Sequence, residues 1–313
     1  MSDIRVLVLD DDPPPDLDRL RGRAHVTSTD EDGLAELLPT ADVVLVWDFT
    51  SPAVRRAWPG PGPRPGWVHT PSAGVDHVLS PEFAASDTVL TNARGVFDRP
   101  IAEYVAGLVL AMAKDLPGTW ERQRQRRWQH RETLRLAGTR AVVVGAGPIG
   151  RAIAETLGCL DVRTELVGRT AREGVRGQAE LPALLVEADW VVCAAPLTEE
   201  TRGMFGSDAF AAMPDRARFI NVGRGPLVDT TALVAALEQQ EIAAAALDVF
   251  ENEPLAPEDP LWQVPGLFVS PHMSGDIVGW RGALSDQFLK LFDLWEAGRP
   301  LFNVVDKQLG YVR

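Results

Sequence analysis

Short hydrophobic runs alternate with segments of helical periodicity along most of the chain, and proline, glycine and aspartate residues separate them. Strands of a parallel sheet are buried on both faces and are joined by amphipathic helices, so this alternation predicts an α/β fold. In the first third of the chain, the runs expected to form strands are Ile4–Leu9, Val43–Trp47, Trp67–His69 and Val89–Leu90.

A second series of the same kind follows a predicted helix over Ile101–Ala113, which Pro117 and Gly118 are expected to end. Six strands are expected in this series, at Ala141–Val144, Arg163–Val167, Trp190–Ala194, Arg218–Val222, Ala244–Val249 and Leu267–Ser270. Because these strands complete the second sheet, the last amphipathic segment, Leu284–Trp295, is expected to return to the first domain.

The sequence therefore predicts two doubly wound parallel-sheet domains. Residues 1–97 together with 284–313 are expected to form one domain, and residues 98–283 the other. The chain length of 313 residues agrees with two domains, at about 100–200 residues per domain. Ahead of the second series lies a basic, tryptophan-bearing stretch, Trp120–Arg131, which we interpret as an exposed connector or an arm that contacts a partner.

Charge and composition narrow the function further. The net charge of −13 disfavours nucleic acid and anionic membrane surfaces as partners. No hydrophobic run approaches the ~20 residues that span a bilayer, and the opening residues lack the pattern of a signal peptide. The two cysteines, Cys159 and Cys193, have no neighbours at metal-binding spacing, so we expect no metal site, a reducing compartment and a cytoplasmic location.

A glycine-rich turn opens the second series. The expected strand runs into Gly145-Ala146-Gly147-Pro148-Ile149-Gly150, and a helix follows. In this context the first glycine allows a tight turn, the second lets the backbone approach a pyrophosphate, and the third allows close packing of helix and strand. The helix amino terminus attracts an anion. The turn therefore predicts a dinucleotide site, with a purely structural turn as the alternative.

The end of the next strand indicates which dinucleotide is bound. NAD sites usually carry an acidic residue there, about 20 residues after the glycines, which binds the ribose 2′-hydroxyl. This chain has Val167-Gly168-Arg169-Thr170 instead. Arg169, with Thr170 and Arg172, suits a 2′-phosphate, so we expect a preference for NADP(H) with NAD(H) still possible. The alternative is a solvated arginine beside a site that accepts both.

Three candidate catalytic residues, Arg224, Glu253 and His272, follow three successive expected strands. Because the carboxyl ends of parallel strands share one edge of the sheet, these side chains are expected to converge beside a nicotinamide. Histidine suits proton transfer near neutral pH, and a glutamate can orient its ring. Arginine can bind a carboxylate and polarise a carbonyl, and Asp248 could bind the nicotinamide carboxamide. Each residue taken singly is equally compatible with an ordinary loop.

The strings GAGPIG, INVGRGPLVD, LDVFENEPL and SPHMSG, with HTPSAGVDHV, TNARGV and IAEYV upstream, resemble the D-isomer-specific 2-hydroxyacid dehydrogenases. The resemblance covers nearly the whole chain. It implies a flavodoxin-like substrate-binding domain, a Rossmann domain that binds NAD(P), and a homodimer. Within that family, the lack of an acidic residue at the end of the second strand makes the chain resemble the NADP-using glyoxylate/hydroxypyruvate reductase branch.

The resemblance also assigns roles. It implies that Arg224 binds a 2-oxo acid, that Glu253 pairs with His272, and that His272 is the acid/base. Substrate binding would use Ala73, Gly74, Val75, Arg224 and His272. Cofactor binding would use Gly145, Gly147, Pro148, Ile149, Gly150, Arg169, Thr170, Ala195, Pro196, Thr201, Val222, Gly223, Arg224, Asp248, His272, Ser274 and Gly275.

The expected function is the NADPH-dependent reduction of a small anionic 2-oxo acid, such as glyoxylate or hydroxypyruvate, to the D-2-hydroxy acid. Two alternatives stay open: a dehydrogenase of the formate or phosphite type, and a nucleotide-sensing interaction protein on the same fold. Trp47 and Trp280 either border the substrate or pack in the core. Trp128 either crosses to a partner subunit or lies in a solvated loop.

Overall fold

The computed structural model of the chain describes residues 4–10, 12, 14–48, 50–60 and 62–312. It divides into two compact units, one made of residues up to Val96 together with those from Ile277 onward, and the other of Phe97–Asp276. The sequence placed these two chain crossings after residues 97 and 283. The predicted fold class, two parallel-sheet α/β domains, is confirmed. Which ligand each unit binds stays a prediction.

The first unit contains a five-stranded parallel sheet in the order β2-β1-β3-β4-β5. This is the doubly wound order of flavodoxin-like folds. Its strands are β1 (Arg5–Leu9), β2 (His25–Thr29), β3 (Val43–Val46), β4 (Trp67–Thr70) and β5 (Val89–Asn92). The edge strand β2 was not predicted, because its sequence HVTST is polar and mostly exposed and so lacks the hydrophobic pattern of a buried strand.

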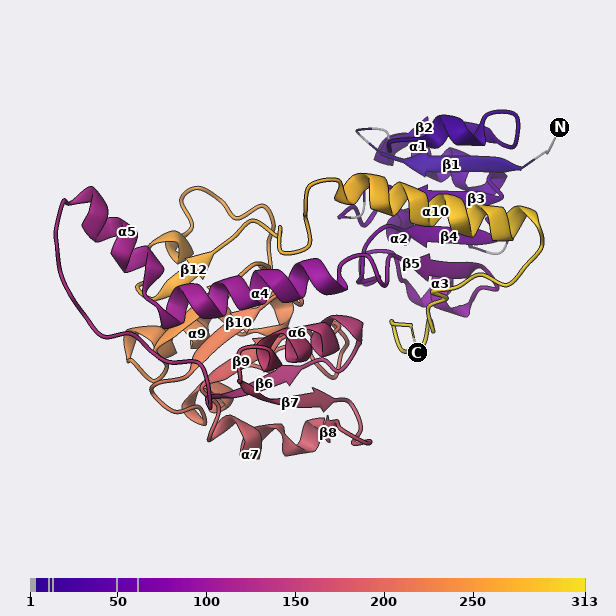
Figure 1. Cartoon of the computed structure of the whole chain (residues 1–313). Coiled ribbons are helices and arrows are strands. Elements are labelled where there is room, and N and C mark those ends of the chain that lie inside the picture. The colour runs from indigo at the N-terminus through magenta and orange to yellow at the C-terminus, as the bar shows by residue number, and fades with distance from the viewer. Residues whose placement is uncertain (1–3, 11, 13, 49, 61, 313) are drawn as a thin grey trace. The chain divides into compact units, whose positions relative to one another are not determined.

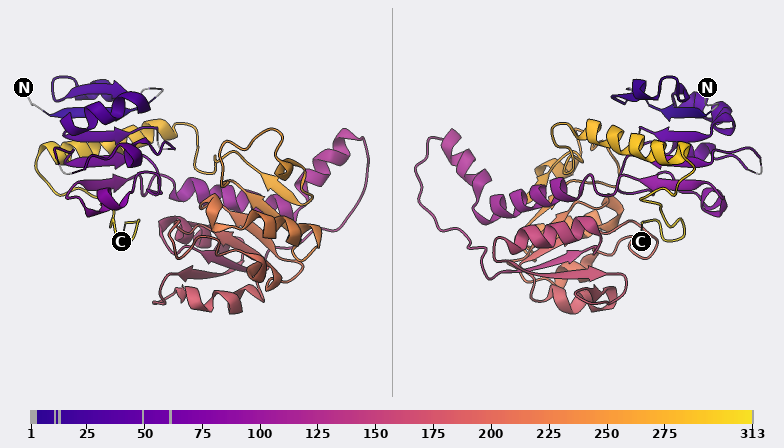
Figure 2. Two further views of the ribbon diagram at one scale, coloured as in Figure 1. Left: turned by 180° about the vertical axis from the view of Figure 1, so that it is seen from behind. Right: turned by 45° about the vertical axis from the view of Figure 1, so that its right-hand side comes forward.

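Helices cover both faces of this sheet (Figures 1 and 2). In β4, Val68 packs into the core cluster beneath the short helices, while Trp67 contacts Phe288 of the last helix at a ring separation of 5.4 Å. The helices on the Val68 side are α1 (Glu31–Leu37), α2 (Ala53–Ala57) and α3 (Pro81–Ala85), and α10 (Trp280–Glu296) lies on the Trp67 side. The short 3-10 helices are η1 (Leu17–Leu20) and η2 (Leu38–Thr40). The predicted return of the last helix to the first sheet is therefore what the structure has.

The second unit contains a seven-stranded parallel sheet in the order β12-β11-β10-β9-β6-β7-β8. Counted from β6, this is the Rossmann order 3-2-1-4-5-6 with one more strand at the far edge. Its strands are β6 (Arg140–Val144), β7 (Arg163–Gly168), β8 (Arg176–Gly177), β9 (Trp190–Cys193), β10 (Arg218–Asn221), β11 (Ala244–Leu247) and β12 (Leu267–Val269). The expectation of six strands was wrong, because β8 has only two residues and no hydrophobic pattern.

Two long helices, α4 (Asp98–Ala113) and α6 (Pro148–Gly158), pack together on one face of this sheet (Figure 1). The other face is covered by α7 (Leu181–Leu185), α8 (Ser207–Ala211) and α9 (Thr230–Glu238), whose hydrophobic side chains share a core cluster with β6, β9, β10 and β11. The 3-10 helices are η3 (Gln178–Glu180), η4 (Gly225–Leu227) and η5 (Pro260–Gln263). Among the described residues, no helix has the length and hydrophobicity needed to cross a membrane.

A further helix, α5 (Leu116–Arg124), corrects the sequence interpretation of this region. Pro117 and Gly118 were expected to end a helix, but Pro117 lies in the first turn of α5, where a missing N–H is tolerated. Asp115 caps the helix by accepting a hydrogen bond from Gly118 N–H at 3.1 Å. The arm predicted over Trp120–Arg131 is therefore helical in its first half and extended after Arg126.

Candidate active site

The glycine-rich turn lies at the carboxyl end of β6. On one side of β6 the sheet continues to β7 and on the other to β9, so the strand order reverses here, and doubly wound sheets bind ligands at such a point. Gly145 has a φ of +115°, and a Cβ there would come within 2.3 Å of the Ala194 carbonyl oxygen. A Cβ on Gly150 would come within 1.7 Å of the Gly145 carbonyl oxygen. Both positions therefore require glycine for the tight turn and for the approach of α6 to the strand.

Gly147 differs from its two neighbours because a Cβ there would meet nothing within 4 Å. It precedes the first residue of α6, Pro148, and no side chain caps this end of the helix. The space beside Gly147 is thus open next to the uncapped amino terminus of α6, the positive end of the helix dipole. This is the arrangement that a dinucleotide pyrophosphate requires, so the turn fits such a cofactor.

Two arginines flank Gly168, the last residue of β7. The Arg169 guanidinium is paired with Glu200, with 3.0 Å between Nη2 and Oε1. Arg172 donates a hydrogen bond from Nη2 to the carbonyl oxygen of Ala146 at 3.3 Å, which places it against the glycine-rich turn. A Cβ on Gly168 would lie 3.2 Å from Arg172 Nη1. The position where NAD sites carry an acid is thus occupied by positive charge.

The Arg224 loop is held in place by the last residue of β10. The Asn221 amide donates to the Arg224 carbonyl oxygen at 2.9 Å, and its Oδ1 accepts from the Gly223 N–H at 3.0 Å. A Cβ on Gly225 would lie 1.9 Å from the carbonyl carbon of Phe250, so the backbone of the next loop packs directly on this one. The glycines around Arg224 therefore bring the loops after β10 and β11 together.

Glu253 and His272 form a hydrogen-bonded pair, with Oε2 2.7 Å from Nδ1. The second carboxylate oxygen of Glu253 accepts from the Phe250 N–H at 2.7 Å. Burial alone would raise the pKa of the Glu253 carboxyl, but the His272 ring, the Phe250 N–H and the charge of Arg224 outweigh it, so the net shift is downward. The carboxylate is thus kept ionised beside the imidazole. With Nδ1 engaged, Nε2 is the ring nitrogen left for proton exchange with a substrate.

Asp248 fixes the loop that carries His272. This carboxylate is almost fully buried and accepts from Ser270 Oγ at 2.6 Å, Met273 N–H at 3.0 Å and Ser274 N–H at 2.9 Å. The backbone carbonyl oxygen of Asp248 accepts a hydrogen bond from the His272 N–H at 2.8 Å. His272 has a φ of +50°, which is uncommon for a residue other than glycine, and these bonds hold it there. In this structure Asp248 contacts the His272 loop, and the contact with nicotinamide that the sequence suggested stays a prediction.

The structure also brings two residues to this site that the sequence analysis did not select. Tyr104 of α4 lies near Ser270: burial and the charge of Asp248 raise the pKa of its phenol, against an opposing effect of Ser270. The pKa of the Asp276 carboxyl is raised by desolvation and by the charge of Asp248, against an opposing effect of His272. Tyr104 belongs to the IAEYV string and Asp276 to none of the motifs named above, and only the structure places either of them near the His272 loop.

The remaining predicted cofactor residues lie on the same strand ends. Ala195, Pro196 and Thr201 follow β9, and Thr201 Oγ1 donates to the Pro196 carbonyl oxygen at 2.8 Å. Val222 follows β10 and is buried. Ser274 and Gly275 follow His272 and are buried, and a Cβ on Gly275 would lie 2.6 Å from the Phe97 ring. Thr170 comes two residues after β7 and is exposed.

In the first unit, the predicted substrate-binding residues form a turn after β4. Its carbonyl oxygens are engaged: that of Ala73 accepts from the Asn92 amide at 2.6 Å, and that of Gly74 accepts from Ser72 Oγ at 2.6 Å. Among the hydrogen bonds of the described residues, none uses the N–H of Gly74 or Val75 as donor. The turn thus directs its acceptors into the protein and leaves two neighbouring donors for an anion.

The tryptophans left open by the sequence have different environments. Trp47 is buried, and the Arg281 guanidinium lies over its ring at 5.5 Å. Trp280 begins α10 and is partly buried. Trp128 is fully exposed, at 101%, in the extended part of the arm.

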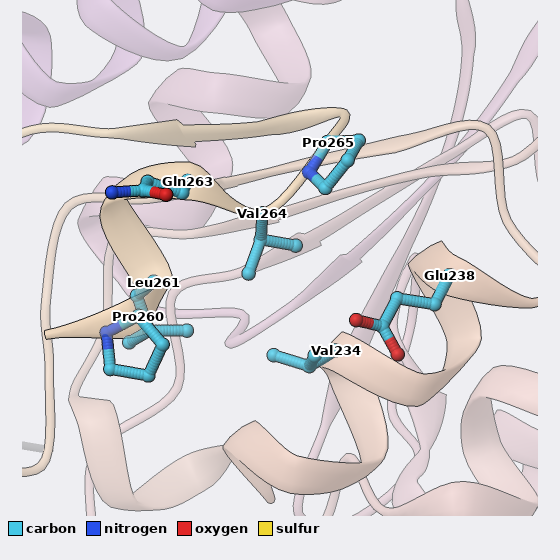
Figure 3. Close-up of a pocket in the computed structure, with 7 residues that line it drawn as sticks. All are labelled: Val234, Glu238, Pro260, Leu261, Gln263, Val264 and Pro265. Atoms are coloured by element: carbon cyan, nitrogen blue, oxygen red, sulfur yellow. The ribbon is translucent and has the colours of Figure 1, made fainter.

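Away from these residues, the second unit has a surface pocket of about 190 Å³ between α9 and η5 (Figure 3). Its wall is mostly hydrophobic and has one carboxylate, Glu238. The lining residues are Val234, Glu238, Pro260, Leu261, Gln263, Val264 and Pro265. None of the predicted catalytic or cofactor residues is among them, so the candidate active site is defined by the strand ends.

Comparison with known proteins agrees with this geometry. Residues 106–274 match the model of the "D-isomer specific 2-hydroxyacid dehydrogenase, NAD binding domain" family. A relative named glyoxylate/hydroxypyruvate reductase B, from Salmonella typhi, is 36% identical over 243 residues, which are 72% of this chain and 72% of the relative.

Solved structures give the same result over the whole chain. An NADPH-dependent glyoxylate/hydroxypyruvate reductase from Sinorhizobium meliloti, in complex with NADP and malonate, superposes with a TM-score of 0.84 at 29% identity and covers 100% of this chain and 99% of its own. A second such reductase from that organism, with NADP and sulfate, gives 0.83 at 26% identity, covering 98% and 100%. The resemblance inferred from the motifs is confirmed: the chain belongs to the D-isomer-specific 2-hydroxyacid dehydrogenases, a family of NAD(P)-dependent oxidoreductases, on its glyoxylate/hydroxypyruvate reductase-like branch.

Proposed function

We propose that this protein is an NADPH-preferring reductase that converts a small 2-oxo acid, of the glyoxylate or hydroxypyruvate type, to the D-2-hydroxy acid. The observation that carries the proposal is the Glu253–His272 pair, which follows β11 and β12 at the same edge of the sheet as Arg224 after β10 and the glycine-rich turn after β6. Reduction of a carbonyl needs a proton donor beside a hydride donor, and a carboxylate-oriented imidazole meets that need.

When bound, the nicotinamide cofactor would supply the hydride. Gly145, Gly147 and Gly150 with the first turn of α6 would hold its pyrophosphate, and residues after β9 and β10 would line the rest of its site. His272 donates the proton to the carbonyl oxygen through Nε2, and Glu253 keeps its ring in the required orientation. Arg224 binds the substrate carboxylate and polarises the carbonyl, which stabilises the charge that develops on oxygen.

The preference for NADPH rests on the end of β7. Arg169 and Arg172 both lie at this strand end, where a 2′-phosphate would be bound, and Thr170 offers a hydroxyl between them. No acidic side chain occupies the position after β7 that binds a ribose 2′-hydroxyl. Two relatives of the same fold were solved with NADP, which supports the same preference.

The first unit would bind the substrate and the second the cofactor. In the first unit, the N–H groups of Gly74 and Val75 would hold the substrate carboxylate, with Ala73 completing the turn. This assignment accounts for the absence of any intramolecular use of those two donors among the described residues.

A homodimer in the cytoplasm is the proposed assembly and location. The arm from α5 to Leu134 exposes Trp120, Trp128 and Leu134, which are large hydrophobic side chains that a partner subunit would cover. Both cysteines are free, as expected in a reducing compartment. Light scattering of the wild type and of Trp128→Glu tests the dimer: a monomeric wild type, or an unchanged mass in the variant, would count against the arm as its interface.

An NADPH-oxidation assay over 2-oxo acids of graded side-chain size tests the activity. We expect turnover on the smallest acids, and a loss of about 10²–10⁴ in kcat for His272→Ala. Arg224→Gln should lower both kcat and kcat/KM, because it removes a substrate contact that strengthens in the transition state. Near-normal turnover in both variants would end the assignment. Tight NADPH binding without turnover of any acid would indicate a nucleotide sensor, and turnover of formate or phosphite a different dehydrogenase.

A further inference from the structure

An ion pair lies at the end of β7, beside the proposed cofactor site. Arg169 follows β7 and Glu200 follows β9, and these two strands flank β6, which carries the glycine-rich turn. The pair joins Arg169 Nη2 to Glu200 Oε1 at 3.0 Å, and both side chains are about half exposed. The guanidinium proposed to bind a 2′-phosphate therefore already has an anionic partner, supplied from the opposite side of the turn.

The position of Glu200 is fixed by its backbone. Its carbonyl oxygen accepts a hydrogen bond from the Gln178 amide at 3.4 Å. The turn around it is closed by bonds from Thr201 N–H and Arg202 N–H to the Thr198 carbonyl oxygen, at 3.1 and 3.0 Å. Because this turn is held at several points, the carboxylate stays within reach of Arg169, and only its side-chain torsions are free to move it away.

The two arginines at this strand end have partners of different kinds. Arg172 donates to a neutral acceptor, the Ala146 carbonyl oxygen, so its charge is uncompensated by that contact. Arg169 donates to a carboxylate, which offsets its charge. A phosphate arriving here would have to displace Glu200 from Arg169, and the displaced carboxylate would then remain close to a second anion. A ribose 2′-hydroxyl brings no charge and leaves the pair intact.

We propose that Glu200 is a specificity-determining residue, which competes with the 2′-phosphate for Arg169 and so limits the preference for NADPH over NADH. The inference rests on the proposed function, in which Arg169 binds that phosphate. A half-exposed ion pair contributes little, so Glu200 lowers the affinity for 2′-phosphorylated ligands about three- to fivefold and does not abolish it. The chain thereby retains measurable binding of both cofactors.

Direct binding measurements test this inference without turnover. NADPH and NADH are titrated by their fluorescence, and adenosine 2′,5′-bisphosphate and AMP by calorimetry, against the wild type, Glu200→Gln, Arg169→Gln and the double variant. Glu199→Gln is the matched control, because it removes an equal charge from the neighbouring exposed position of the same turn. Thermal unfolding of each variant checks that the fold is retained.

We expect Glu200→Gln to raise the affinity for NADPH and adenosine 2′,5′-bisphosphate about three- to fivefold. The affinities for NADH and AMP should change less than about twofold. In the Arg169→Gln background the same substitution should have almost no effect, because the competition needs the guanidinium. Equal effects of Glu200→Gln and Glu199→Gln, or weaker NADPH binding in Glu200→Gln, would overturn the inference.

The same data separate this inference from the function on which it rests. If Arg169→Gln weakens NADPH selectively while Glu200→Gln leaves its affinity unchanged, the competition is wrong and the proposed NADPH preference stands. If Arg169→Gln affects NADPH and NADH equally, Arg169 does not bind the 2′-phosphate, and both proposals for this residue fall together.

Discussion

Nδ1 of His272 lies 2.7 Å from Oε2 of Glu253, while Oε1 of the same carboxylate accepts the Phe250 N–H at 2.7 Å. The carboxylate is thus held from two directions, by a ring and by the backbone. The fixed carboxylate orients the His272 imidazole through Nδ1, and Nε2 is then the nitrogen available for proton transfer to a substrate.

Glu253→Gln should lower kcat for 2-oxo acid reduction on the order of 10- to 100-fold, less than removal of His272, because the ring remains but loses its ionised partner. The fold should persist, since the glutamine oxygen can still accept the Phe250 N–H. Steady-state kinetics across pH measure the effect. Glu251→Gln changes an exposed neighbour in the same loop; it is the control and should leave kcat unchanged. A Glu253→Gln enzyme with half the wild-type kcat would contradict this role.

Asp248→Asn should impair catalysis without contacting substrate. An amide in place of the carboxylate can accept fewer hydrogen bonds, and its NH₂ group would face the N–H of Met273 or Ser274. Loss of bonds to a buried charged group costs about 1.5–3 kcal/mol, and the His272 loop would relax from its positive φ. We expect kcat to fall about tenfold or more. Ser270→Ala, which removes only one of the donors, should lose much less, and an equal loss in both variants would argue against a loop-positioning role.

Two glycine substitutions in one turn should have opposite outcomes. Gly147→Ala meets nothing within 4 Å, so the protein should fold normally and lose dinucleotide affinity ~10-fold or more, because the new methyl group would stand where a pyrophosphate approaches. Gly150→Ala would place Cβ 1.7 Å from the Gly145 carbonyl oxygen and should destabilise the second unit by about 3 kcal/mol or more. Thermal unfolding and NADPH titration of both variants check this. Unimpaired binding in Gly147→Ala would remove the pyrophosphate from this turn.

His69 should make the first unit sensitive to acid. Its side chain is completely buried in β4, and burial lowers the pKa of the ring to about 3. Nδ1 is bonded to Thr91 Oγ1 at 2.8 Å, and Nε2 has no partner among the described residues. An unfolded chain binds a proton near pH 6.5, and the folded chain does not until about pH 3. This group therefore reduces stability progressively as pH falls through that window, by at most about 1.36 kcal/mol per pH unit.

His69→Phe should remove that acid sensitivity while preserving contacts with Trp67 and Phe288, whose rings lie 6.2 and 5.7 Å away. Urea unfolding at pH 7.5 and 5.5 measures it. The wild type should lose more stability between these values than His69→Phe, and the exposed His130→Gln should behave as the wild type. A loss in His69→Phe as large as in the wild type would show that another group is responsible.

The elements that the sequence predicted well are those with a strong hydrophobic pattern. Strands such as Val43–Val46 and Trp190–Cys193 are buried along their whole length, so every residue contributes to the pattern. The strands it missed are an exposed polar edge strand, His25–Thr29, and the two-residue Arg176–Gly177. The helix Leu116–Arg124 was missed because a proline can either end a helix or occupy the first turn of one. The residue type is the same in both cases, and only the path of the chain distinguishes them.

The sequence by itself determined the fold class, the glycine-rich turn and the candidate residues that follow successive strands, because burial and turn chemistry are local properties of a segment. The pairing of Glu253 with His272, 19 residues apart, was expected from the resemblance. Only the tertiary structure decided two others, Asp248 with the loop beyond β12 and Arg169 with Glu200, which are separated by 25 and 31 residues. Those pairings depend on strand order and register, which align the loops of distant segments at one edge of the sheet, and no local pattern records that alignment.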